Sequence, residues 1–161
     1  MKLTIRFGFS LILAWLTSMA SVQTAQASVT TDHSGTICHA YNASQATLVD
    51  YFDYGTRNIA TYSLPVVCPL VRSTNNSAGA TADVDVFTFS NQTISCTFSS
   101  YPWNSNTPKG TVTQSWTGTG SHEFSMTLPS GSSDFWSTYS VRCTLPPSGS
   151  GVLKDVDLIE Y

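Results

Sequence analysis

Several aromatic residues of this sequence have surroundings that suit ligand binding. Tyr101 and Trp103 lie in a proline-containing segment, residues 100–108, and Trp136 interrupts the polar side of an alternating stretch. An exposed flat ring can stack on the face of a sugar, and an amide such as that of Asn104 can hydrogen-bond to its hydroxyl groups. These four residues therefore predict a binding surface for a glycan, with another exported protein as the alternative partner.

A competing interpretation buries the same rings. Large aromatic side chains rarely stay exposed, so Trp103 could cap one end of the core and Trp136 could pack beneath residues 100–108. The two interpretations differ in one observable, which is whether Trp103 and Trp136 are exposed together.

Acidic side chains form two further groups, Asp83 with Asp85, and Asp155 with Asp157 and Glu160. Aspartates two residues apart on a strand share one face of the sheet. Two carboxylates fall short of the six to eight oxygens that calcium takes, unless a loop such as 73–82 supplies carbonyl groups. We favour a charged sheet edge that blocks strand addition, and we predict no metal or other cofactor.

The sequence contains no recognisable catalytic motif. Its histidines, His33, His39 and His122, belong to no Cys/His metal spacing, and no Gly-x-Ser-x-Gly elbow occurs. We therefore favour a non-catalytic protein and predict no catalytic residues. The alternatives are a small secreted hydrolase with a non-obvious carboxylate or His site, for which Glu123 and His122 are the residues to replace, and a structural component of an envelope or extracellular assembly.

Residues 1–27 are typical of a secretory signal peptide. Lys2 and Arg6 precede an apolar run over residues 7–20, and Ala25-Gln26-Ala27 provides a small-x-small cleavage site. The prediction is a secreted or periplasmic protein with one domain, residues 28–161, and no membrane span after cleavage. That domain has five Lys and Arg residues against ten acidic ones, a formal charge of −5. Without a basic cluster, nucleic acid is excluded as a partner.

Four cysteines remain after residue 27: Cys38, Cys68, Cys96 and Cys143. An even number in an exported chain predicts disulfides, but four cysteines allow three connectivities, among which the sequence does not choose. We favour Cys38–Cys68 with Cys96–Cys143, because the second pair joins two stretches with the same alternating pattern.

Those stretches, residues 93–99 and 135–145, alternate apolar and polar side chains and so predict half-buried strands in two facing layers. Further strands are predicted at 36–41, 58–63, 83–89, 110–116, 123–128 and 152–160. Residues 90–92 are predicted to be a hairpin turn between 83–89 and 93–99, and residues 29–35 a mobile tail. Short strands with turn residues between them and no clear helix predict an all-β antiparallel β-sandwich, of jelly-roll or immunoglobulin-like type, held by disulfides.

Two cysteine-containing motifs carry a resemblance. Residues 67–72 read Val-Cys-Pro-Leu-Val-Arg, and residues 139–146 read Tyr-Ser-Val-Arg-Cys-Thr-Leu-Pro. Together with a cysteine between them and a closing β segment, they make the chain similar to a group of small exported bacterial β-sandwich proteins. The resemblance implies export and a structural role for the cysteines, and it implies no activity.

Overall fold

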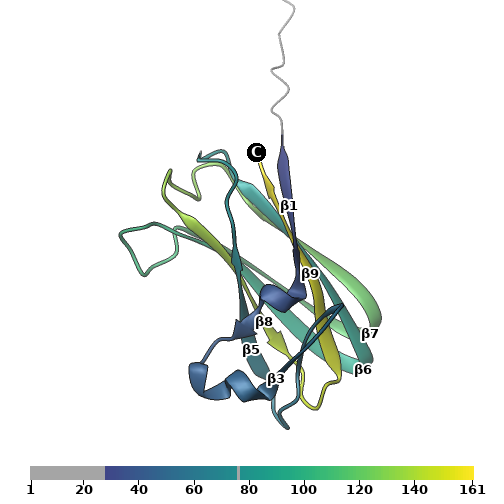
Figure 1. The fold of residues 1–161 in the computed structure, drawn as a ribbon. Helices are drawn as coiled ribbons and strands as arrows, with labels where there is room; N and C mark the ends of the chain where they lie inside the picture. The colour runs from purple at the N-terminus through teal and green to yellow at the C-terminus, as the bar shows by residue number, and fades with distance from the viewer. Residues whose placement is uncertain (1–27, 76) are drawn as a thin grey trace, which may run out of the picture.

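The computed structural model describes residues 28–75 and 77–161, and nearly all of its regular structure is β-strand (Figure 1). The nine strands are β1 (Val29–Ser34), β2 (His39–Ala40), β3 (Val49–Phe52), β4 (Gly55–Asn58), β5 (Leu64–Leu70), β6 (Ala80–Tyr101), β7 (Gly110–Leu128), β8 (Thr138–Leu145) and β9 (Gly151–Glu160). Two short 3-10 helices, η1 (Gly35–Ile37) and η2 (Ala43–Leu48), precede β2 and β3. No helix in these described ranges is long and apolar enough to cross a bilayer.

The longest strands, β6 and β7, form one hairpin that belongs to both layers of the sandwich. Residues 80–88 of β6 pair with β9, and residues 95–101 pair with β8, while β7 accompanies β6 throughout. We call the two layers the β9 half (β1, β3, β4 and β9, with 80–88 and 120–128) and the β8 half (β2, β5 and β8, with 92–101 and 110–118). All pairings are antiparallel.

The hairpin turn predicted at 90–92 was wrong, because residues 83–99 run through a single strand. Thr88 pairs with Gly120, and the next paired residues are Gln92 and Gly118. Between these two pairs β6 advances by four residues and β7 by only two. Such an irregularity bends a strand while pairing continues on both sides of it. Gly120 contributes a φ of 102°, a conformation that a residue with a Cβ rarely adopts.

Alternation places the core between the two halves. Phe98 and Ile94 from the β8 half, and Val84, Phe124 and Leu158 from the β9 half, belong to one buried cluster. The all-β antiparallel sandwich predicted from the period-two pattern is therefore the fold of this chain.

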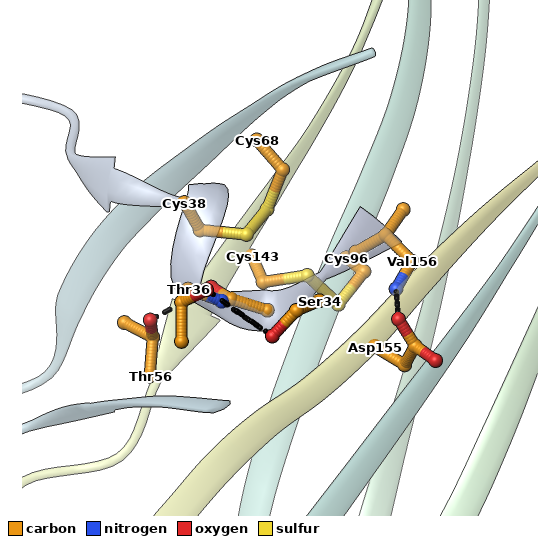
Figure 2. The surroundings of a disulfide bond; sticks show 10 residues. Ser34, Thr36, Cys38, Thr56, Cys68, Cys96, Cys143, Asp155 and Val156 are labelled. Carbon is orange, nitrogen blue, oxygen red and sulfur yellow. Dashed lines mark hydrogen bonds between the residues drawn. A yellow bond between two sulfur atoms is a disulfide. The ribbon is translucent and has the colours of Figure 1, made fainter. Parts of the chain in front are cut away.

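Both disulfides have the pairing that we favoured, and all four cysteines are fully buried (Figure 2). The prediction that Cys96 and Cys143 join facing layers was wrong. They lie directly opposite each other on the neighbouring strands β6 and β8, with 4.1 Å between their Cα atoms. Cys38 similarly lies beside Cys68 at the start of the short β2–β5 pairing. Each bridge therefore ties two adjacent segments of the β8 half.

Several other local predictions were wrong, because a local pattern does not show which segments find a pairing partner. Residues 29–34 are not a tail, since they pair with β9 along their whole length as β1. Residues 58–63 leave β4 as a loop, and 36–41 contains η1 and only two strand residues. The signal-peptide prediction lies outside the described residues.

Strand β5 contains two prolines and still pairs with β8 along its whole length. The carbonyl of Pro65 accepts from Tyr41 N, so the backbone groups of Pro65, Val67 and Pro69 point toward the two-residue strand β2. The positions without an N–H group therefore lie on the β2 side of β5, where only two residues pair. The ladder between β5 and β8 stays continuous.

Candidate functional site

Two loops at one end of the sandwich carry exposed tryptophans. Trp103 lies in the loop between β6 and β7, and Trp136 lies in the loop between β7 and β8, both at the left of Figure 1. Their exposed fractions are 73 % and 62 %, and together the two rings line a hollow of about 480 Å³. The interpretation that Trp103 caps the core and Trp136 packs beneath residues 100–108 does not hold, because both rings are open to solvent side by side.

A second hollow, of about 530 Å³, adjoins the first at Trp103. It runs toward the outer surface of β8, and most of its lining is aromatic or hydroxyl-bearing: Tyr41, Tyr101, Trp103, Ser105, Thr138 and Ser140. The hollow thus offers flat rings beside hydrogen-bonding groups.

The predicted site residues occupy different places in this arrangement. Tyr101, Trp103 and Trp136 line one or both hollows, whereas Asn104 is exposed on the β6–β7 loop and lines neither. Asn106 lines the second hollow instead. Sequence reasoning missed Tyr41, which lies sixty residues before Tyr101 and reaches the hollow only through the β2–β5 pairing.

The Trp136 loop also shows where the alternating pattern of residues 135–145 stops. β8 begins at Thr138, so Phe135 is not turned inward as its parity predicted but is about half exposed. Its ring meets that of Trp136 edge to face, with 4.7 Å between the ring centres. This contact restricts the orientation of Trp136, since edge-to-face aromatic pairs are favourable.

Direct contacts hold the two tryptophan loops together. Lys109, at the end of the β6–β7 loop, forms an ion pair with Asp134 of the β7–β8 loop. At Gly110 the loops are so close that an added Cβ would lie 2.6 Å from the Cβ of Ser132. The two loops are therefore held to each other near Lys109 and Gly110 by an ion pair and by close packing.

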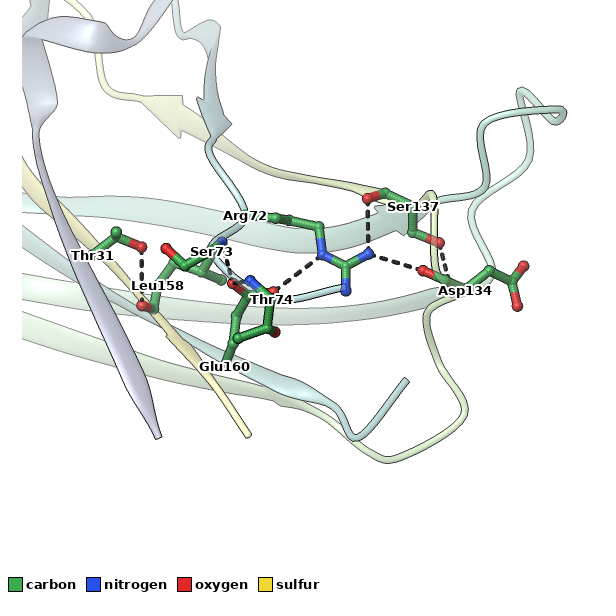
Figure 3. Close-up of polar contacts among 8 residues, drawn as sticks. All are labelled: Thr31, Arg72, Ser73, Thr74, Asp134, Ser137, Leu158 and Glu160. Carbon is green, nitrogen blue, oxygen red and sulfur yellow. Dashed lines mark hydrogen bonds and ion pairs between the residues drawn. The ribbon is translucent and has the colours of Figure 1, made fainter. Parts of the chain in front are cut away.

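Arg72 binds the backbone of the Trp136 loop (Figure 3). Its Nη1 donates to the carbonyl oxygens of Asp134 and Ser137, at 2.8 and 3.0 Å, on either side of the Phe135–Trp136 pair. Its Nε donates to the Glu160 carboxylate at 3.1 Å, and Glu160 is only 1 % exposed. The backbone N–H groups of Ser73 and Thr74 donate to the other Glu160 oxygen. Glu160 is thus a buried, fully engaged carboxylate and no member of a charged edge.

Six other carboxylates gather on the outer face of the β9 half. Register places Asp83, Asp157 and Asp32 in one row across β6, β9 and β1, and it pairs Asp85 with both Asp155 and Glu123. Five of these residues line a hollow of about 70 Å³. The edge-protection interpretation was wrong, because β6 and β9 are inner strands of this half.

Crowding of like charges affects Asp157 most. Desolvation by burial, followed by the nearby charges of Asp155 and Asp32, raises the pKa of Asp157 from 3.8 to about 6. One oxygen each of Asp83 and Asp157 is buried without a hydrogen-bond partner in the described part of the chain. Among the described residues, no three metal-ligating side chains are arranged to hold an ion.

The histidines lie on separate strands, β1, β2 and β7. His122 is stacked on Trp116 at 4.8 Å between ring centres and meets Phe124 edge to face. Glu123, as its strand neighbour, points to the opposite, acidic face. The side chains of His122 and Glu123 therefore lie on opposite faces of β7.

Comparisons with known proteins show likeness in fold alone. No protein-family model matches the chain, and no curated protein matches it. A solved structure of TmCBM61 in complex with beta-1,4-galactotriose is similar over 82 % of this chain and 88 % of that one, with a TM-score of 0.47 and 7 % identity.

Proposed function

We propose that this protein is an exported, non-catalytic β-sandwich that binds a glycan across Trp103 and Trp136. The observation that carries the proposal is the joint exposure of the two rings around one hollow. Exposed apolar patches on soluble proteins generally mark interaction sites, and flat aromatic rings with hydroxyl and amide groups beside them suit the alternating apolar and polar faces of sugars.

The support for a built site lies in the loops. Lys109, Gly110 and Arg72 each restrain the segments that carry the rings, and restraint before binding lowers the entropy lost when a ligand is bound. The two buried disulfides agree with export, because disulfides persist in oxidising compartments.

The test is affinity electrophoresis of residues 28–161 in gels containing soluble polysaccharides, followed by titration calorimetry with the best ligand. Trp103→Ala should weaken binding at least about tenfold, the loss typical of a central aromatic contact. Phe89→Ala is the matched control, since Phe89 is an exposed aromatic on β6 outside both hollows. Equal affinity of wild type and Trp103→Ala for every ligand found would contradict the proposal.

A further inference from the structure

Charge is segregated between the two halves of the sandwich. The outward acidic residues Asp32, Asp83, Asp85, Glu123, Asp155 and Asp157 all belong to the β9 half. The strand segments of the β8 half contain no Asp or Glu at all, and their only Lys or Arg is Arg142. The strand segments beside the second hollow are thus free of the charges that would repel an anion, and the nearby Asp134 of the β7–β8 loop is paired with Lys109.

Arg142 lies on the same exposed strand face as that hollow. Thr138, Ser140 and Arg142 alternate along β8 with buried residues, so they point to the same side, and the first two line the hollow. The guanidinium carbon of Arg142 lies 5.5 Å from the centre of the Tyr41 ring, and Tyr41 lines the same hollow. Arg142 therefore lies next to the hollow, two residues beyond Ser140 on β8 and over the Tyr41 ring.

The charge of Arg142 is not neutralised within the protein. Arg57, Arg72 and Lys109 form ion pairs with Asp50, Glu160 and Asp134, but Arg142 forms none within the described part of the chain. A planar guanidinium held over an aromatic ring keeps its N–H donors available, and its geometry matches carboxylate and sulfate oxygens.

We infer that the ligand is an acidic polysaccharide. Its chain would extend from Trp136 past Trp103 and along β8, so that Arg142 binds a carboxylate or sulfate group. The inference rests on the proposed function and adds two features to it: the negative charge of the ligand, and a path that includes Tyr41 and Arg142. Trp103, which lines both hollows, connects the two parts of this path.

Binding to matched polymers tests the charge. Polygalacturonate and its fully methyl-esterified form share a backbone and differ in carboxylate charge, while dextran sulfate and dextran provide the sulfate pair. We expect wild-type protein to bind one charged member more tightly than its neutral counterpart, and the pair that shows this difference identifies the anionic group.

Substitutions of Arg142 test whether the charged group of the polymer binds there. Arg142→Gln should weaken binding of the charged polymer about tenfold, the effect of losing one charge-assisted hydrogen-bond group. The affinity of Arg142→Lys should lie between those of Arg142→Gln and wild type, because lysine keeps the charge but lacks the planar guanidinium. Lys154→Gln is the control, since it removes an exposed cation from the β9 half. Thermal unfolding should be similar for all four proteins.

The outcomes separate the two proposals. Binding of neutral polymers that depends on Trp103 but not on Arg142 would overturn the acidic-ligand inference and leave glycan binding in place. Equal weakening by Arg142→Gln and Lys154→Gln would also overturn it, because net charge rather than the β8 position would then matter. Failure of wild-type protein to bind any polysaccharide would contradict both the proposed glycan binding and the acidic-ligand inference.

Discussion

Asp157 lies in a row of carboxylates that crosses three strands, with Asp32 on one side and Asp83 on the other. The pKa of its carboxyl group is about 6 in the folded protein, against 3.8 ordinarily, because burial and neighbouring charges disfavour ionisation. The folded state therefore binds more protons than the unfolded state between these pH values. The free energy of unfolding therefore decreases as the pH rises from about 4 to 6, because ionising Asp157 costs more in the folded state. Above pH 6 this destabilisation has reached its full size.

The substitution Asp157→Asn should remove that penalty. At pH 7.5 we expect the free energy of unfolding of the variant to exceed that of wild type by about 1 kcal/mol, which corresponds to a few degrees in Tm. This value is smaller than the pKa shift alone implies, because solvent screens the charges. At pH 4 the two should differ little, because Asp157 is then protonated in the folded protein. Thermal unfolding followed by circular dichroism at both pH values measures the difference. A Tm gain of the same size at pH 4 would show that charge is not its cause.

At the scale of elements, one buried arginine connects four segments. Arg72 follows β5, pairs with Glu160 at the end of β9, donates to the β7–β8 loop and lies 4.9 Å from the ring centre of Tyr139 on β8. The loop that carries Trp136 has no regular secondary structure of its own. Its conformation therefore depends on these donors as well as on its ends.

Replacing Arg72 by lysine should separate the charge from the geometry. Lysine can still pair with Glu160, but it lacks the fork that reaches the carbonyl groups of Asp134 and Ser137 together. We expect a loss of about 2 kcal/mol in the free energy of unfolding, from two hydrogen bonds donated by a charged group. We also expect faster proteolysis of the 129–137 loop and weaker glycan binding.

Arg57→Lys provides the matched control. Arg57 pairs with Asp50 at the surface, where both side chains are more than a third exposed, so its replacement should cost less than about 1 kcal/mol and leave glycan binding unchanged. Similar losses in both variants would mean that Arg72 does not hold the loop.

The alternation of side chains explains why some elements could be predicted and others could not. β8 and the cysteine-bearing part of β6 bury one face each, so period two is visible in their sequences. In contrast, β1 is paired on one side only and is largely polar, so nothing local in 29–34 distinguishes it from a tail. The continuity of β6 through residues 89–91 depends on β7 and β9 and has no local signal.

At the scale of the whole molecule, the candidate site combines predictable and unpredictable parts. Trp103 and Trp136 could be selected from the sequence because a large ring in a loop is unusual. Tyr41 and Arg142 could not, since their proximity depends on the order of strands β2, β5 and β8. The segregation of charge has the same origin: Asp85 and Asp155 are seventy residues apart in sequence and become direct partners through β6–β9 pairing.

That segregation has a kinetic consequence for binding an anionic polymer. The acidic side chains of the β9 half lie across the core from the hollows, and facing sheets are separated by about 10 Å. At about 10 mM salt the Debye length of about 30 Å exceeds this distance, so the remote carboxylates repel the approaching polymer. At 150 mM salt the Debye length is about 8 Å, and the same charges are largely screened.

The double substitution Asp85→Asn and Asp155→Asn should therefore raise the association rate constant for polygalacturonate about twofold at 10 mM and leave it unchanged at 150 mM. Surface-immobilised polymer and stepwise salt changes measure both rates. An equal increase at both salt concentrations would place the polymer next to the β9 half, because only charges near the contact escape screening.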